Sequence, residues 1–172
     1  MAVPAKPVAH PFPPLYDADS VKLILGTMPS PQSRARQFYY GHPQNRFWRV
    51  IAAVYREPPP RAPAEKRSLL SRHRLALWDV LARCEISGAA DATIVAPVAN
   101  DLTGLLRRAP ITRVYANGTR AYQLYQKLCY PQTGIAATPL PSTSPANARF
   151  SLAKLIAAYA AALTPESAAR WN

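Results

Sequence analysis

The chain has 172 residues, the length of one ordinary domain, and 49% of them are hydrophobic, so it can bury a core without disulfide support. Charged residues make up 17%, too few for a disordered chain, and the longest apolar stretch is too short to cross a bilayer. Lys and Arg number 21 against 9 Asp and Glu, a net charge of +12. Such a charge favours polyanionic partners, nucleic acid before acidic membrane.

The basic residues gather in one part of the chain. Ten lie between residues 34 and 74, where the acidic residues are Glu57 and Glu65. These ten are Arg34, Arg36, Arg46, Arg49, Arg56, Arg61, Lys66, Arg67, Arg72 and Arg74. The planar guanidinium suits phosphate, although a GC-rich genome would also favour arginine.

Residues 1–15 contain five prolines and are expected to form an extended arm, leaving residues 16–172 as a single domain. The PxxP-like spacing of the arm is an alternative signal for a partner protein. Residues 21–25 predict a buried strand that ends at Gly26, and residues 26–31 predict the turn that leaves it.

Strands then alternate with helices along the chain. Helices are predicted over residues 44–55, 62–73, 101–108, 119–129 and 150–163, and strands over residues 75–80, 93–98, 113–116 and 135–140. This order indicates an α/β fold, a three-layer α/β/α arrangement with a short, mostly parallel central sheet of about four strands. In such sheets ligands bind outside the carboxyl ends of the strands, here the loops after Leu25, Val80, Val98, Ala116 and Leu140.

The absence of several known motifs narrows the kinds of site that the sequence could form. The chain has no GxxxxGK[ST], GxGxxG, HExxH or GxSxG string, so nucleotide cofactors and a zinc or serine hydrolase site are not expected. Three scattered histidines give no metal triad, and we expect neither cofactor nor metal. Cys84 and Cys129 match no metal spacing and are expected to be buried reduced thiols in a cytoplasmic protein.

Three segments carry candidate site residues. The first, GTMPS over residues 26–30, is a rigid loop after a strand, or a plain tight turn. In the second, YYGHPQNRFW over residues 39–48, paired tyrosines offer a surface for stacking a nucleobase, and Asn45 is expected in the first turn of a helix, as a water-binding amide or as a cap. The third, LPSTSPANAR over residues 140–149, is a rigid loop that can approach a phosphate, or a plain helix entry.

Together these segments resemble the uracil-DNA glycosylase superfamily, and most closely its hypoxanthine-DNA (deoxyinosine) glycosylase branch. The likeness runs from about residue 21 to residue 163 and also covers LWDV and VYANGTRAY, at residues 77–80 and 114–122. It implies a monofunctional enzyme that flips a deaminated base out of DNA and excises it by water attack. Related branches keep an Asn or Asp where this chain has Met28, and the hypoxanthine branch assigns the catalytic role to the Asn of HPxNxFW, which is Asn45.

The resemblance also assigns the remaining site residues. Tyr40 corresponds to the aromatic residue that stacks on the flipped base, and Thr27 and Met28 of the first motif are expected to bind the base as well. The phosphate-binding and wedging loop corresponds to Ser142, Thr143, Ser144, Pro145, Ala146, Asn147 and Arg149. Trp78 and Asp79 are candidates for base contact, with a core tryptophan and a cap as the alternatives.

The expected partner is single- or double-stranded DNA that contains a deaminated base, bound by a monomer. No membrane partner is expected. Leu140 stands where other branches place a His that stabilises the leaving uracil anion, so uracil is expected to be a poor substrate. Two alternatives stay open: a uracil or mismatch-uracil glycosylase on the same scaffold, and a DNA-binding protein without catalysis.

Overall fold

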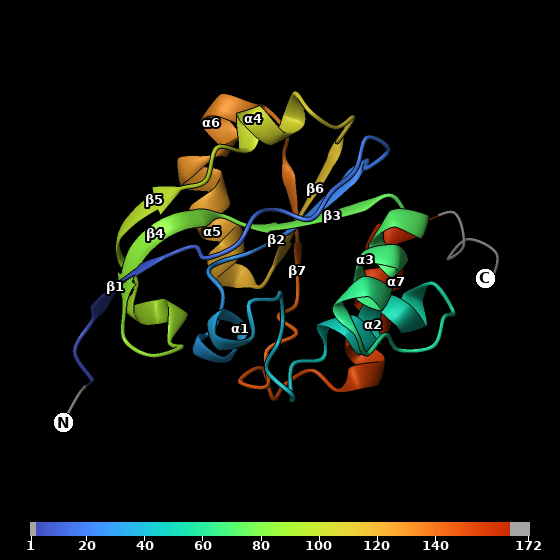
Figure 1. Cartoon of the computed structure of the whole chain (residues 1–172), viewed down its shortest axis with the longest axis horizontal. Helices are drawn as coiled ribbons and strands as arrows, with labels where there is room; N and C mark the ends of the chain where they lie inside the picture. Colours follow the sequence, from blue (N-terminus) through green and yellow to red (C-terminus); the bar gives the residue numbers. More distant parts are fainter. Residues whose placement is uncertain (1–2, 166–172) are drawn as a thin grey trace.

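The computed structural model describes residues 3–165 and has two sheets with helices around them (Figure 1). The strands are β1 (Lys6–Ala9), β2 (Lys22–Gly26), β3 (Leu75–Asp79), β4 (Leu81–Ile86), β5 (Val95–Ala99), β6 (Arg113–Asn117) and β7 (Ala137–Leu140). The helices are α1 (Pro31–Arg36), α2 (Phe47–Val54), α3 (Pro63–Arg72), α4 (Leu102–Leu106), α5 (Thr119–Leu128), α6 (Tyr130–Thr133) and α7 (Leu152–Leu163), with a 3-10 turn η1 (Asp91–Thr93).

The central sheet has four parallel strands in the order β3-β2-β6-β7. Successive side chains of β2 point to opposite faces: Ile24 enters the core formed with α2, α3 and α7, whereas Leu23 and Leu25 enter the core formed with α4 and α5. This three-layer α/β/α arrangement confirms the predicted fold class. It also brings the carboxyl ends of the four strands to one edge.

A second sheet, in the order β1-β4-β5, is antiparallel and was not predicted. The strand predicted over residues 93–98 is present as β5, but its expected place in the parallel sheet is wrong, because β5 pairs antiparallel with β4 in this second sheet. Only Val80 separates β3 from β4. Two neighbouring parallel strands need a long crossover connection, so β4 cannot lie beside β3 as a parallel strand. The loop after Val98 therefore does not follow a strand of the central sheet, although Asn100 in it donates to the Asp79 carbonyl at the end of β3.

The proline-rich segment packs onto the domain. Lys6–Ala9 pair with β4, and Leu15 exchanges backbone hydrogen bonds with Leu77 at 2.8 and 2.9 Å. Phe12 packs on the core that contains α2. The segment before residue 16 thus contributes a strand and core contacts.

Two remaining expectations concern the cysteines and the membrane. Cys84 and Cys129 are both free and buried, as predicted, and burial raises the pKa of the Cys129 thiol to about 11. Among residues 3–165, no helix combines the length and apolar character that a membrane crossing requires.

Candidate active site

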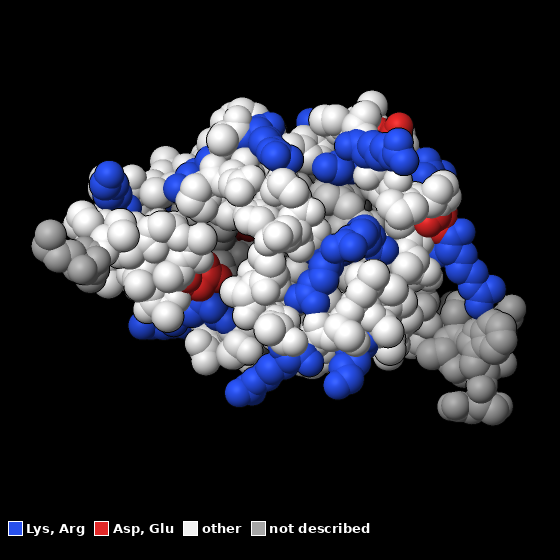
Figure 2. All heavy atoms as spheres, turned by 90° about the horizontal axis from the view of Figure 1, so that it is seen from below, with Lys and Arg blue, Asp and Glu red and all other residues white. Residues whose placement is uncertain are grey.

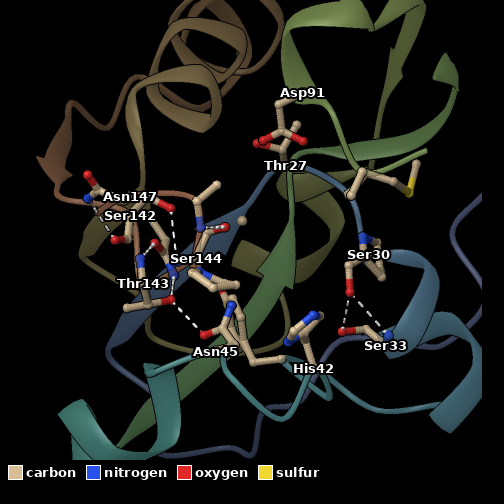
Figure 3. Close-up of a pocket in the computed structure, with 18 of the residues that line it drawn as sticks. Thr27, Ser30, Ser33, His42, Asn45, Asp91, Ser142, Thr143, Ser144 and Asn147 are labelled. Atoms are coloured by element: carbon tan, nitrogen blue, oxygen red, sulfur yellow. Dashed lines mark hydrogen bonds between the residues drawn. The ribbon is translucent and has the colours of Figure 1, made fainter. Parts of the chain in front are cut away.

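A cavity of about 770 Å³ lies at the carboxyl edge of the central sheet. The ends of β2, β3 and β6 contribute Gly26, Asp79 and Asn117, and the loop after β7 contributes Pro141 to Asn147. The loop between α1 and α2 adds Tyr40 and Asn45. All three segments singled out in the sequence therefore meet at one site (Figure 3).

Asn45 lies before α2 and not in its first turn, because the helix begins at Phe47 with Arg46 as N-cap. Its Oδ1 accepts hydrogen bonds from the Phe47 N–H and from the Thr143 hydroxyl, both at 2.9 Å. These two bonds use both lone pairs of the amide oxygen. The Nδ2 group donates to no other described residue, so it is the part of the amide left for a ligand.

A chain of hydrogen bonds fixes this orientation (Figure 3). Asn117, at the end of β6, donates from Nδ2 to the Thr143 hydroxyl and accepts from the Thr143 N–H, both at 3.0 Å. The hydroxyl must then donate its proton to Asn45 Oδ1. Since Thr143 is fully buried, the strand end, the loop and the amide are held as one unit.

Tyr40 forms an aromatic wall of the cavity. Its ring stacks on Phe47, with centroids 4.0 Å apart and planes at 19°. Burial, reinforced by the Asp79 charge and partly opposed by Asn117, raises the pKa of Tyr40 above its ordinary value. The phenol therefore stays neutral, and the stacked pair offers a rigid surface for a planar ligand.

The loop from Pro141 to Phe150 is held by Arg46, which the sequence did not single out as a site residue. The guanidinium donates to the carbonyls of Ser144 at 2.8 Å, Asn147 at 3.0 Å, Thr143 at 3.4 Å and Phe150. A buried loop carbonyl without a donor is costly, and one side chain here satisfies four of them. The adjacent residues Asn45 and Arg46 thus bind the same loop from two sides.

Within that loop, short side chains bond to nearby backbone. Asn147 Nδ2 donates to the Ser142 carbonyl at 2.9 Å, and the Ser142 hydroxyl accepts from the Ser144 N–H at 3.1 Å. Arg149 is exposed and lines the cavity with Pro145 and Ala146. Gly118, at φ +98°, allows the loop to approach, since a Cβ there would lie 3.2 Å from Ser142 Cβ.

Asp79 lies at the base of the cavity, paired with a residue that the sequence did not assign to the site. Its Oδ2 is 2.7 Å from Nε2 of His10, and both side chains are about 5% exposed or less. The other oxygen lies against Gly26, where an added Cβ would be 2.3 Å away. Glycine is therefore required at position 26 to leave room for the carboxylate.

A second carboxyl group, Asp91, enters the cavity from η1 beside Thr27 (Figure 3). Burial raises its pKa, the Thr27 hydrogen bond opposes this, and the Asp79 charge adds to it. Sequence reasoning did not assign Asp91, Asn117, His10 or Arg46 to the site, because each acquires its place through tertiary contact. Arg46 and Asn117 lie inside the strings YYGHPQNRFW and VYANGTRAY, but the strings alone gave them no role.

The predicted site residues are mostly brought together. Of those named from the sequence, the cavity is lined by Thr27, Met28, Tyr40, Asn45, Asp79, Ser142, Thr143, Ser144, Pro145, Ala146, Asn147 and Arg149. Trp78 is not among the described lining residues. It packs against both cores, in agreement with the alternative of a core tryptophan. No group of three or more His, Cys, Asp or Glu able to hold a metal occurs within residues 3–165.

The fold and the cavity define an α/β protein with a site for a planar ligand at its sheet edge, between an aromatic wall and a rigid loop. The family model of the uracil DNA glycosylase superfamily matches residues 13–164. The chain belongs to this superfamily, and its substrate is DNA.

Three relatives support that assignment. A protein named hypoxanthine DNA glycosylase from Methanosarcina acetivorans is 37% identical over 142 residues, covering 81% of this chain and 89% of the relative. One of the same name from Methanosarcina barkeri is 32% identical over 140 residues, covering 80% and 87%. A solution NMR structure from M. acetivorans, provisionally assigned as a uracil DNA glycosylase, has a TM-score of 0.73 and 33% identity, covering 87% of this chain and 94% of its own.

Proposed function

We propose that the protein is a monofunctional DNA glycosylase that removes hypoxanthine from deoxyinosine. The observation that carries the proposal is the Asn45 amide, held by Thr143 so that its Nδ2 is free at the cavity. The names of the Methanosarcina relatives support hypoxanthine as the base. Met28, in the first motif, offers no group that could bind water in place of Asn45.

The base must leave the helical stack to be reached, at a cost of a few kcal/mol that is smallest for poorly paired bases. The flipped base stacks on Tyr40, and Ser142 to Arg149 hold the distorted backbone through N–H groups and Arg149. Asn45 Nδ2 then donates to the oxygen of the attacking water. A positioned nucleophile accounts for a large part of such a rate enhancement.

The bond is broken by water and not by an amine of the protein. No lysine is among the described residues that line the cavity, which supports an enzyme that leaves an abasic site without cutting the strand. We further propose that the protein acts as a monomer in the cytoplasm, on DNA of either strandedness. Weak activity on uracil follows from Leu140, which supplies no imidazole for the leaving anion.

The test is single-turnover incubation with oligonucleotides that contain deoxyinosine, deoxyuridine or deoxyxanthosine, each single-stranded and in duplex. Strand breaks are expected only after alkali and fastest for deoxyinosine. Asn45→Ala should lower that rate by on the order of a hundredfold, because the nucleophile is no longer positioned. Binding of the damaged duplex without any abasic product would instead support a DNA-binding protein that has no catalytic activity.

A further inference from the structure

The proposed hydrolysis leaves one proton without an acceptor. Asn45 cannot take it, because an amide does not titrate and its Oδ1 is already filled by Phe47 and Thr143. Met28 cannot take it either. Among the described residues that line the cavity, the side chains able to accept a proton at neutral pH are those of Asp79, Asp91 and His42. His42 is half-buried on the loop before α2, and its Nδ1 already accepts from the Gln44 N–H.

We propose that Asp79 accepts the proton of the attacking water and that His10 positions its carboxylate for this step. The inference rests on the proposed function and replaces the base contact expected for Asp79 from the sequence. The water oxygen forms a bond to C1′ while the C1′–N9 bond breaks and its electron pair leaves with the purine. One water proton passes to Asp79 Oδ1, and solvent later removes it.

The geometry favours Asp79 over Asp91. Asp79 ends β3, next to Gly26 at the end of β2, so the central sheet fixes its backbone. His10 holds Oδ2 at 2.7 Å, whereas Oδ1 accepts from no other described residue and lies where Gly26 leaves space. Asp91 instead sits on a short 3-10 turn after the loop that follows β4.

Four titratable groups of the described residues surround Asp79. Tyr39 and Tyr40, from the loop before α2, both have a raised pKa, caused first by burial and then by the Asp79 charge. Asp91 from η1 and His10 from the proline-rich segment complete the titratable groups that face it. The buried imidazole Nδ1 of His10 has no partner among residues 3–165, so the hydrogen bonding of His10's ring is directed to Asp79.

The pair is tested by a double-mutant cycle on the single-turnover excision of deoxyinosine. Asp79→Asn should lower the rate by on the order of a hundredfold, the size of a general-base contribution, without changing affinity for a duplex with an abasic-site analogue. The wild-type rate should fall as the pH is lowered, and the Asp79→Asn rate should not. His10→Ala should lower the excision rate about tenfold, because the carboxylate is misplaced. In the Asp79→Asn background, His10→Ala should lower the rate no further.

Two further variants separate chemistry from folding. Gly26→Ala keeps the charge of Asp79 but displaces its oxygen, so it should also slow excision. The His73–Glu57 pair outside the cavity is a matched control, and His73→Ala and Glu57→Gln should keep the wild-type rate.

Two results would overturn the proposal for Asp79 and His10. In either case, excision of deoxyinosine by the wild-type protein would leave the proposed function intact. An equal His10→Ala loss in both backgrounds, accompanied by a lower melting temperature, would mean that His10 only packs. An Asp79→Asn variant with altered preference among the three bases but an unchanged rate and pH profile on deoxyinosine would return Asp79 to base contact.

Discussion

At the scale of single residues, the site depends on how one amide is oriented. The string YYGHPQNRFW was enough to nominate Tyr40 and Asn45, because aromatic and amide groups beside a helix start are a recognisable pattern. It could not predict that Thr143, 98 residues away, donates to Asn45 Oδ1. Under the proposed function, that bond leaves Nδ2 to face the substrate, and only the folded chain brings the two residues together.

This orientation predicts that an aspartate at position 45 will not substitute for the asparagine. Asn45→Asp keeps an oxygen to accept from Phe47 N–H and from the Thr143 hydroxyl, so the fold should be retained. It removes the N–H₂ donors, and the excision rate should fall about as far as in Asn45→Ala, on the order of a hundredfold. Single-turnover rates and melting curves check this. Retained activity would show that the oxygen is the working atom.

At the scale of secondary-structure elements, helical periodicity could be recognised in the sequence, whereas the pairing of strands could not. α7 was predicted closely because Leu155, Tyr159 and Leu163 recur at helical spacing on its buried face. β4 was missed because the predicted strand ended at Val80, and Leu81–Ile86, which contain Arg83 and Glu85, form no continuous apolar run. β1 was missed because Pro7 and the prolines on either side of the strand hide an element that exists only through pairing with β4.

The Arg46 contacts predict that this side chain stabilises the loop between β7 and α7. Arg46→Ala should lower the free energy of unfolding by about 2 kcal/mol or more, since hydrogen bonds from a charged donor contribute roughly 1.5–3 kcal/mol each and are not additive. Arg49, exposed on the same helix, is the matched control, and Arg49→Ala should stay within about 0.5 kcal/mol. Urea denaturation measures both.

The same substitution should loosen the loop locally. Amide exchange at Asn147, whose N–H bonds to Ser144 within the loop, is expected to speed up in Arg46→Ala and not in Arg49→Ala. Unchanged exchange at Asn147 would mean that the internal bonds of the loop suffice to hold it.

At the scale of the whole molecule, the positive charge of the protein favours binding to DNA. On the face that Figure 2 shows, Lys and Arg side chains are spread widely and acidic atoms appear in few places. The net charge of +12 could be read from the sequence. Arg149 was already named in the third motif segment, and it lines the cavity, whereas Arg113 begins β6 at the opposite edge of the central sheet.

The salt dependence of DNA binding is expected to distinguish Arg149 from Arg113. Arg149 lines the cavity, so Arg149→Ala should weaken duplex binding and reduce the slope of log affinity against log salt by about 1. Arg113 is exposed at the amino end of β6, the opposite edge of the sheet, and Arg113→Ala should leave the slope unchanged. Fluorescence anisotropy over a salt series measures both. Equal effects would indicate that DNA contacts the protein by charge alone and not at the cavity.

The pairing of β1 with β4 has a practical consequence for trimming this chain. A fragment that starts at Tyr16 keeps all three motif segments, yet it lacks His10 and exposes the outer backbone edge of β4. Open strand edges recruit one another, so we expect this fragment to elute as dimers or larger species in gel filtration. Clipping by a protease in the first fifteen residues would therefore damage a repair enzyme whose every signature string is still present.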